Sequence, residues 1–383
     1  MTAESYALEA KRTDQHSQDS SLAFVLLGLF GEVGSLLSEV KKKQRDTASR
    51  IGYAEAVAEE FGDVLWYLST VADRTNLPLE TLMRGVDLEH TALETGRDGS
   101  TTFASLQPAV LPRPGVPTSA LESTLLRLAA ETGRLVADHA DDLLDDDDTL
   151  ARRLTAIMSV LIRAANEAHV SLEVAALKNC RKIQGRWPST RIQSPALDVS
   201  AEPEEQLPRT LTIEIFERKV NGRNYVFQRC NNLNIGDRLT DNAMEADDYR
   251  FHDVFHLAYA SVLTWSPVIR SLLRRKRKSE SRTDEVEDGA RAKLIEEGVA
   301  TLIFGQAKEL ELFADVERGK LSFDLLKQIR RFVAGYEVES APPWLWEEAI
   351  LQGYAAFRYL REHRRGRLHL DLNARQLSIE ALP

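Results

Sequence analysis

Four acidic residues in two apolar, helix-patterned runs most constrain what this chain can form. The first run contains Glu32 and Glu39, and the second contains Glu60 and Asp63. Apolar residues recur at helical spacing around them, and spacings of seven and three place each pair of acids on one helix face. The segment between the runs is short enough to fold two helices into an antiparallel hairpin. Facing helices would gather these carboxylates into one cluster, and hard oxygen donors in this number suit Mg²⁺ or Mn²⁺.

The two runs resemble the signature of the MazG-like, all-α nucleoside triphosphate pyrophosphohydrolases, which carry Glu-x-x-Glu on one helix and Glu-x-x-Asp on the next. The second half is matched by Glu60-Phe-Gly-Asp63, whereas Glu32-Val-Gly is followed by Ser35 where the family has its second Glu. Glu39, one turn beyond Ser35, is the candidate replacement. The alternative, that these acids lie on solvated helix faces, fits less well because apolar residues flank them on both helices.

The composition is that of an ordinary soluble protein. With 383 residues, the chain is long enough for two or three domains, and 43% hydrophobic residues provide for real cores. The net charge of −10 argues against general nucleic-acid binding. The two cysteines give neither a disulfide framework nor a paired zinc motif. We found no apolar signal region and no uninterrupted stretch long enough to span a bilayer, so we expect a cytoplasmic protein without a membrane partner.

A second region, residues 119–188, repeats features of the first. Glu131-Thr-Gly-Arg-Leu corresponds to Glu32-Val-Gly-Ser-Leu. His169-Val-Ser-Leu-Glu173 likewise corresponds to Asn76-Leu-Pro-Leu-Glu80. Aligning these two segments places Arg153 opposite Glu60 and Ala156 opposite Asp63, so the second copy lacks the acidic pair. Two such helical repeats can bury their apolar faces against each other, so we expect an intrachain pseudo-dimer.

The second copy carries a polar and cationic tail that the first copy lacks. Asn179, Lys182 and Arg186 lie at spacings of three and four, on one helical face. This pattern is similar to the Asn-x-x-Lys tail that contacts the nucleotide in the MazG-like family. We therefore predict one composite site, with acids from the first repeat and the tail from the second. The alternative for Lys182 and Arg186 is an interaction with the dipole of a helix C-terminus.

The resemblance also implies a role for each residue in hydrolysis of an NTP or dNTP to the monophosphate and pyrophosphate. The expected metal ligands are Glu32, Glu39, Glu60 and Asp63. The expected proton acceptor is Glu59 or Glu60. The expected substrate-binding residues are Asn179, Lys182 and Arg186. The implied cofactor is Mg²⁺ or Mn²⁺, the implied partner is a nucleoside triphosphate, and a homo-oligomer is compatible with the pattern.

The last part of the chain predicts an α+β domain. Alternation in residues 211–230 around an Asn-Gly pair predicts a β-hairpin, and alternation in residues 368–379 predicts a closing strand pair. Helical patterns lie between these two segments, including one over residues 244–274. The expected division is repeat 1 over residues 1–97, a linker over 98–118, repeat 2 over 119–188, a linker over 189–208, and the α+β domain over 209–383.

A second candidate site lies in this domain. His252 and His256 are four residues apart on a predicted helix, a spacing that can hold one metal ion. Asp253 directly follows His252, which resembles the His-Asp doublet of HD-type phosphohydrolases, although residues 210–248 offer no upstream His. Glu296 and Glu297 are candidates to complete the site. The alternative is a pair of core histidines hydrogen-bonded to these glutamates.

Two functions follow from these patterns. The first is a Mg²⁺-dependent nucleotide pyrophosphohydrolase with a role in the nucleotide pool or in bacterial defence, because similar C-terminal regions follow MazG-like units in bacterial conflict systems. The second starts from the ligand lost at Ser35. In it, the repeats form a nucleotide-sensing or dimerisation module, and any chemistry occurs at His252 and His256.

Overall fold

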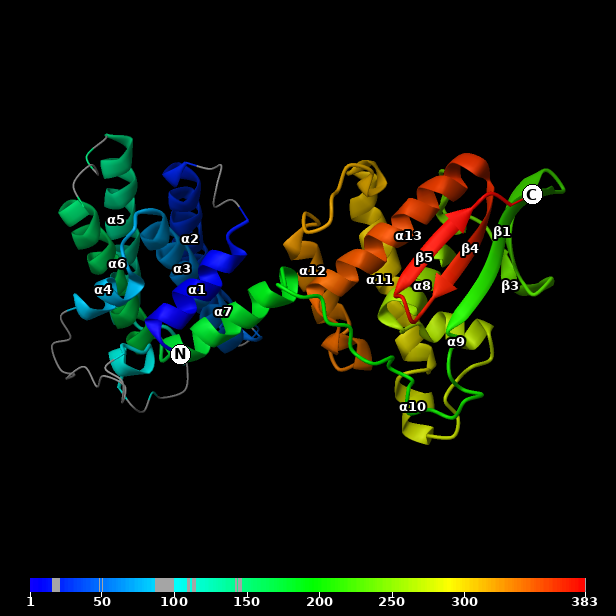
Figure 1. The fold of residues 1–383 in the computed structure, drawn as a ribbon, viewed down its shortest axis with the longest axis horizontal. Helices are drawn as coiled ribbons and strands as arrows, with labels where there is room; N and C mark the ends of the chain where they lie inside the picture. The colour runs from blue at the N-terminus through cyan, green and yellow to red at the C-terminus, as the bar shows by residue number, and fades with distance from the viewer. Residues whose placement is uncertain are drawn as a thin grey trace. The chain divides into compact units, whose positions relative to one another are not determined.

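The computed structural model of the chain describes residues 1–15, 21–47, 49, 51–86, 100–108, 111, 115–141, 143 and 147–382. It separates into two compact units, Met1–Ser189 and Thr190–Pro383 (Figure 1). The first unit is helical and the second combines helices with one sheet, so the predicted combination of an all-α part and an α+β part is confirmed. The predicted boundary at residues 97 and 98 lies outside the described residues.

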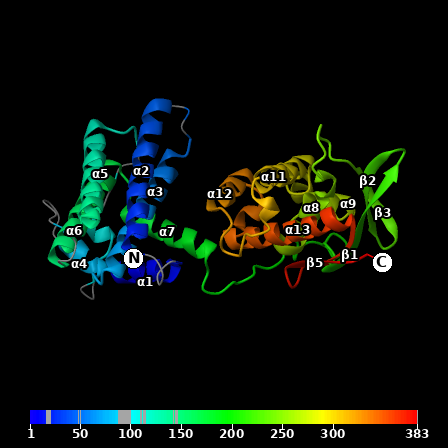
Figure 2. The same ribbon diagram turned by 90° about the horizontal axis from the view of Figure 1, so that it is seen from above.

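The first unit is built from two long helical hairpins and several shorter helices (Figures 1 and 2). Its helices are α1 (Ala3–Thr13), α2 (Leu22–Asp46), α3 (Tyr53–Arg74), α4 (Leu79–Arg84), the 3₁₀ turn η1 (Ala104–Leu106), α5 (Ser119–Ala140), α6 (Asp147–Glu167) and α7 (Leu172–Arg186). The predicted hairpin of α2 and α3 is present, and its helices pack together along their apolar faces. Helix α2 also packs against α5, and α3 packs against α7.

All these helices share one hydrophobic core. Buried residues of α2, such as Leu29 and Val33, belong to the same cluster as Leu128 of α5 and Leu161 of α6. By length and composition alone α2 is apolar enough to cross a membrane, contrary to the expectation from the sequence. Seven of its residues are nevertheless buried within this unit. The relation of the two hairpins as tandem repeats stays a prediction.

Part of the predicted linker over residues 98–118 is packed onto the first unit. Phe103 is fully buried and its ring meets that of Tyr6 edge to face, with centroids 5.3 Å apart. Gln107 donates to the backbone oxygen of Val170 (2.9 Å) and accepts from the backbone nitrogen of Leu172 (2.7 Å). Apolar and hydrogen-bonding side chains thus fix part of the predicted linker.

The second unit places one antiparallel sheet against a group of helices. Its strands are β1 (Thr210–Val220), β2 (Arg223–Cys230), β3 (Leu233–Leu239), β4 (Arg365–Asp371) and β5 (Gln376–Glu380). They follow the order β3-β2-β1-β4-β5, so both predicted hairpins join one five-stranded sheet through the β1–β4 pair. The β1–β2 turn is made by Asn221 and Gly222, both with positive φ (50° and 81°), as expected for a two-residue hairpin. Strand β3 was not predicted because it is an exposed edge strand.

The helices of this unit surround a second core. The main ones are α8 (Asp253–Ala258), α9 (Pro267–Leu272), α10 (Ser281–Val286), α11 (Ala290–Lys308), α12 (Phe323–Phe332) and α13 (Pro343–His363). Four shorter turns accompany them: η2 (Tyr249–Phe251), the π-helical turn η3 (Tyr259–Leu263), η4 (Glu311–Phe313) and η5 (Glu337–Ser340). Helix α13 runs alongside β4 and β5 and packs against α8 (Figure 1).

The helix predicted over residues 244–274 is divided in the structure. After η2, α8 and η3, Thr264 adopts a left-handed conformation with φ of 55°. This residue ends the π-helical turn and allows Ser266 to cap α9 by accepting from the backbone nitrogen of Ile269. Apolar periodicity continues across such a break, which is why the sequence pattern did not show it.

The segment predicted as a linker over residues 189–208 is also partly packed. Asp198 is buried, and its carboxylate accepts from the guanidinium groups of Arg209 and Arg270, both at 2.7 Å. The backbone nitrogen of Leu207 donates to the same carboxylate. This ionic anchor attaches the segment to the second unit, which begins at Thr190.

Candidate functional sites

Three predicted metal ligands come together in the first unit. Helix α2 supplies Glu32, and α3 supplies Glu60 and Asp63, which lie three residues apart on one face. One carboxylate oxygen from each lies within 4.8 Å of the others. All three residues are partly buried. This acid cluster, defined as Glu32, Glu60 and Asp63, offers the hard oxygen donors that Mg²⁺ prefers.

The cationic tail on α7 reaches the acid cluster. Lys182 Nζ forms an ion pair with the Asp63 carboxylate and lies 3.2 Å from Glu59 Oε1. Asn179 Nδ2 donates to Asp63 Oδ1 at 2.8 Å. The Tyr6 hydroxyl donates to Asn179 Oδ1 at 3.1 Å, which orients the amide. Tyr6 was missed from the sequence because it lies in a polar N-terminal stretch, far from any motif.

A glycine allows α7 to come this close to α3. A Cβ atom added at Gly62 would lie 2.9 Å from both the Ala175 oxygen and the Asn179 Cβ, closer than real Cβ atoms approach. Gly62 stands between Glu60 and Asp63 in the sequence. The same short motif therefore provides two acids and the gap that admits the tail.

Negative charge accumulates in the acid cluster. The pKa of Glu60 is raised from 4.5 to about 7, first by burial and then by the neighbouring carboxylates of Asp63, Glu32 and Glu59, while Lys182 opposes the shift. Burial alone would lower the pKa of Lys182, but Asp63 and Glu59 outweigh it and the pKa is raised. A divalent cation would compensate the negative charge of these carboxylates. The donor set therefore fits Mg²⁺.

Two other predicted site residues, Glu39 and Arg186, have different neighbours. Glu39 is about two turns, or ~10 Å, further along α2 than Glu32. It is buried, and its carboxylate pairs with Lys42 at 2.8 Å. Burial raises the pKa of Tyr53, and the Glu39 charge adds to this shift. Glu39 is not one of the three residues of the acid cluster, and its replacement of the family ligand at Ser35 stays a prediction. Arg186 is buried at the end of α7, and its guanidinium lies over the ring of Trp187, 5.5 Å from the centroid.

The second predicted cluster is also assembled. His252 Nε2 and His256 Nε2 lie 3.8 and 3.3 Å from Glu297 Oε2. One donor atom from each of these residues falls within 4.8 Å of the others. His252 immediately precedes α8, His256 lies within it, and Glu297 comes from α11. We call these three residues the histidine cluster.

Glu296 and Asp253, the other two predicted acids, also contact the histidine rings. Glu296 is fully buried, and its Oε1 lies 2.8 Å from His256 Nδ1, on the side of the ring away from Glu297. Asp253 Oδ1 lies 3.2 Å from His252 Nε2, and its other oxygen accepts from Gln228. Burial alone would lower the pKa of His256, but Glu296 and Glu297 raise it well above its usual value. This pocket therefore favours a positive charge.

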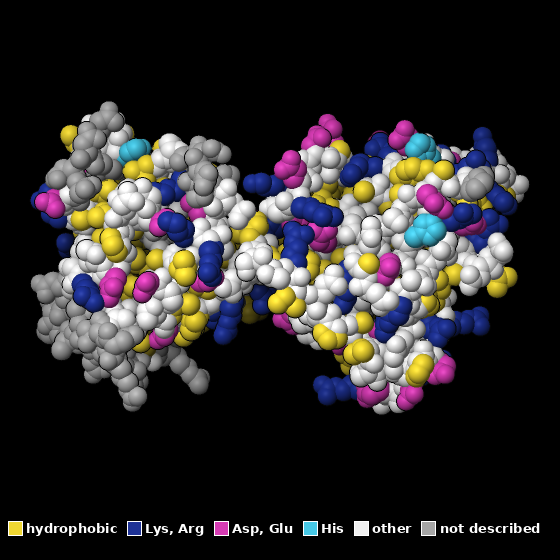
Figure 3. Space-filling model, in the orientation of Figure 1, with side chains coloured by type: hydrophobic (Ala, Val, Ile, Leu, Met, Phe, Trp, Pro, Cys, Tyr) yellow, Lys and Arg dark blue, Asp and Glu magenta, His cyan; other side chains and the backbone are white. Residues whose placement is uncertain are grey.

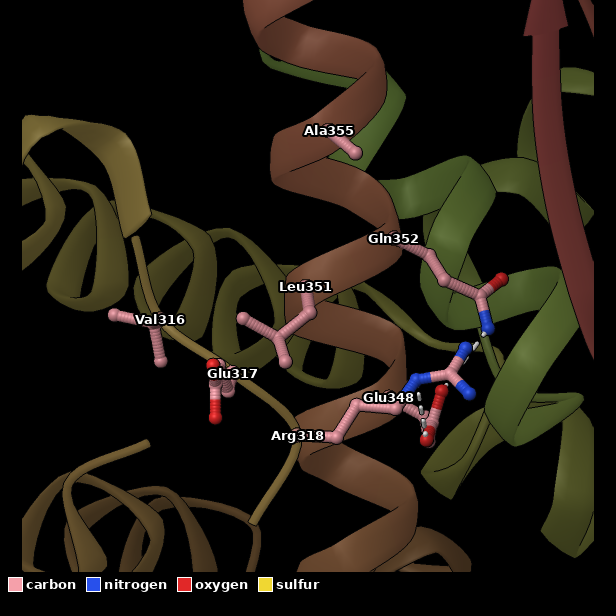
Figure 4. A pocket seen from close by; sticks show the side chains of 7 residues that line it. All are labelled: Val316, Glu317, Arg318, Glu348, Leu351, Gln352 and Ala355. Atoms are coloured by element: carbon pink, nitrogen blue, oxygen red, sulfur yellow. Dashed lines mark hydrogen bonds and ion pairs between the residues drawn. The ribbon is translucent and has the colours of Figure 1, made fainter. Parts of the chain in front are cut away.

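An open hollow of about 580 Å³ lies elsewhere in the second unit, beside α13. Figure 4 shows Glu348 and Arg318 side by side in it, and Arg318 Nε lies 3.2 Å from Glu348 Oε1. None of its lining residues belongs to either cluster. On the face shown in Figure 3, acidic and basic side chains are interspersed within each unit.

Comparison with known proteins identifies the second unit. The profile of a family described as the MazG C-terminal domain matches residues 192–383. The Gene 37 protein of Mycobacterium phage L5 is 35% identical over 63 residues, which are 16% of this chain and 55% of that protein. The chain thus spans about half the length of this curated relative. No solved structure matches the chain.

Proposed function

Because this chain belongs to the family of the MazG C-terminal domain, we propose that its first unit is a MazG-like nucleotide pyrophosphohydrolase. The reaction would convert an NTP or dNTP and water to the monophosphate and pyrophosphate. The observation that carries the proposal is the meeting of the acid cluster with Lys182 of α7. Acids alone are common on helices, but a lysine and an amide donor brought to them from a distant helix form a site suited to a metal-bound polyphosphate.

The residues of the site would divide the work between metal and substrate. Glu32, Glu60 and Asp63 would hold Mg²⁺, which when bound neutralises triphosphate charge and activates an attacking water. Lys182 Nζ and Asn179 Nδ2 would donate to phosphate oxygens, since both already lie against the Asp63 carboxylate.

Glu59 is the residue best placed to accept the proton of the attacking water. It lies beside the acid cluster, 3.2 Å from Lys182 Nζ, yet is outside the group of three donors. Its carboxylate is therefore not committed to the metal. General-base catalysis needs a carboxylate that is not a metal ligand and lies within hydrogen-bond reach of the nucleophile.

A turnover assay tests the proposal. The purified full chain is incubated with a panel of NTPs and dNTPs and Mg²⁺, and the products are separated by ion-exchange chromatography. We expect one nucleoside monophosphate and one pyrophosphate per nucleotide consumed, with no nucleoside diphosphate. Release of inorganic phosphate and a nucleoside diphosphate would contradict the proposed reaction.

The second candidate function rests on Ser35. The acid cluster has three carboxylates rather than the four of the family pattern, which favours a weaker metal site. In this alternative the first unit binds nucleotide as a sensor without turning it over. Nucleotide binding in the absence of hydrolysis, across the whole panel, would support the sensor and overturn the enzyme.

A further inference from the structure

We propose that the second unit binds a divalent transition metal ion, such as Zn²⁺, through His252 Nε2, His256 Nε2 and the Glu297 carboxylate. This site uses other residues, another unit and softer donors than the acid cluster. It does not depend on the proposed pyrophosphohydrolase activity. Nothing in the comparisons assigns a metal to the matched family.

The spacing of the donor atoms suits one shared ion. Zinc bonds to histidine nitrogen and carboxylate oxygen measure about 2.0–2.2 Å, so tetrahedral ligands lie roughly 3.3–3.6 Å apart. The two Nε2 atoms lie 3.3 and 3.8 Å from Glu297 Oε2. Small side-chain movements would bring the three donors onto one ion.

A hydrogen bond at Nδ1 orients each histidine ring. His256 Nδ1 lies 2.8 Å from Glu296 Oε1, and His252 Nδ1 lies 2.8 Å from the Tyr249 backbone oxygen. Both partners are acceptors, so each Nδ1 carries a hydrogen. When a metal ion replaces the proton on Nε2, that nitrogen presents its lone pair to the ion. Ligating histidines typically donate their second nitrogen to a carboxylate or carbonyl in this way.

Further contacts hold the groups that orient the histidine rings. Glu296 accepts from Ser266 Oγ at 2.6 Å and from the Val268 backbone nitrogen at 2.8 Å. The Tyr249 ring stacks on that of His252, with centroids 4.4 Å apart and planes 3° from parallel. The site is therefore held in a binding geometry by its surroundings.

A purely structural role explains the cluster less well. His256 is fully buried, and its Nε2 forms an ion pair with Glu297 Oε2 at 3.3 Å without good hydrogen-bond geometry. A buried core histidine normally satisfies both nitrogens. A metal ion would use this nitrogen.

One side of the site is open to solvent. The Glu297 side chain is 41% exposed, in contrast to the fully buried His256. An ion bound by two histidines and one carboxylate keeps at least one position for water or another ligand, as in catalytic rather than closed structural zinc sites. Asp253, beside His252 Nε2, lies where it can accept a hydrogen bond from such a water.

Metal analysis of the full chain tests the proposal. Protein stripped with a chelator is titrated with Zn²⁺, and affinity is measured by competition with a chromophoric chelator. We expect one high-affinity ion per chain that persists in Asp63→Asn, which separates this site from the acid cluster. Co²⁺ in place of Zn²⁺ should give visible absorption bands typical of nitrogen ligation. Stoichiometry at background in the wild type would overturn the proposal.

Variants identify the ligands. Glu297→Gln should weaken Zn²⁺ binding by at least ~100-fold, and its partial exposure makes misfolding a lesser concern than for His256→Ala. Glu296→Gln, a positioning residue, should weaken it by roughly 10- to 100-fold. His369→Ala is the matched control, because His369 lies on β4 with a 44% exposed side chain. Equal Zn²⁺ affinity in Glu297→Gln and His369→Ala would overturn the assignment.

Discussion

The acid cluster of the first unit and the histidine cluster of the second each bring three donor atoms within 4.8 Å of one another, but the donor types differ. The acid cluster is made of carboxylates alone, and its charge is compensated by Lys182. In the histidine cluster two nitrogens join one carboxylate, and the rings are held by acceptors behind them. Oxygen donors suit Mg²⁺ and imidazole suits Zn²⁺ or iron, so the two proposed sites would differ in metal preference.

The surroundings of the two clusters also act on different properties, charge in the first and ring orientation in the second. In the acid cluster, burial and the neighbouring carboxylates raise the pKa of Glu60. In the histidine cluster, a fully buried carboxylate sets the ring geometry while a partly exposed one completes the donor set. The first arrangement depends on ionic balance, and the second on fixed hydrogen bonds.

Loss of one carboxylate should give the largest effect and test the acid cluster as a metal site. Asp63→Asn keeps the shape but removes a charge, so we expect hydrolysis to fall by at least ~100-fold. The control is Asp73→Asn on the same helix, where Asp73 pairs with Lys11 at the surface. Steady-state kinetics with varied Mg²⁺ measure both. Wild-type turnover in folded Asp63→Asn would remove the metal role from the cluster.

Removal of Lys182 tests whether the site combines the acid cluster with the cationic tail of α7. Lys182→Ala should weaken triphosphate binding by roughly 10- to 100-fold, the value of one charge-assisted contact of ~1.5–3 kcal/mol. Lys178→Ala is the control, because Lys178 lies one turn earlier on α7 and is exposed. Binding of a non-hydrolysable analogue by calorimetry measures the difference. Full affinity in Lys182→Ala would exclude the tail from the site.

Mixing the two variants sharpens the same question. In this structure Asp63 and Lys182 meet within one chain, although 119 residues separate them. Inactive Asp63→Asn and Lys182→Ala chains should therefore stay inactive when mixed. Recovered activity would show that the working site forms between chains.

The pH dependence of stability probes the ionic balance of the acid cluster. With a Glu60 pKa of about 7 when folded and 4.5 as the ordinary value, the folded protein binds more protons between these values. The unfolding free energy contributed by Glu60 then falls as pH rises through this window and stays low above it. Glu60→Gln should thus stabilise the metal-free protein at about pH 8 by ~1–2 kcal/mol, allowing for solvent screening, and little at about pH 4.

Thermal melts in chelator at the two pH values measure this effect. Glu55→Gln, at an exposed position of the same helix, is the control. An equal gain at both pH values would indicate better packing of the amide rather than relief of charge repulsion.

The smallest expected effect concerns the missing family ligand. Ser35→Glu adds a fourth acid three residues from Glu32, on the same face of α2, and should tighten Mg²⁺ by ~1 kcal/mol, roughly fivefold. Ser35→Gln is the neutral control. Glu39→Gln should leave Mg²⁺ affinity nearly unchanged, because Glu39 pairs with Lys42. A severe loss in Glu39→Gln would show that Glu39 reaches the metal after all.

Local spacing determined a large part of this protein from the sequence alone. The hairpin of α2 and α3, the shared face of Glu60 and Asp63, and the Asn-Gly turn between β1 and β2 each follow from a short repeat or a turn preference. The four-residue spacing of His252 and His256 likewise predicted two rings on one helix face. These features depend on helix or strand geometry, which a few neighbouring residues fix.

Tertiary packing decided which of these residues meet. Glu39 matched the helix face of Glu32, but its position further along α2 placed it beside Lys42 and Tyr53. Adjacent Glu296 and Glu297 could not be told apart in sequence, yet one lies behind His256 and the other beside its Nε2.

The approach of α7 to α3 was decided in the same way. It brings Lys182 to Asp63, and it depends on the shared core and on the space left at Gly62. A periodic pattern specifies a direction around one helix, whereas the distance to another helix is set by all the side chains packed between them.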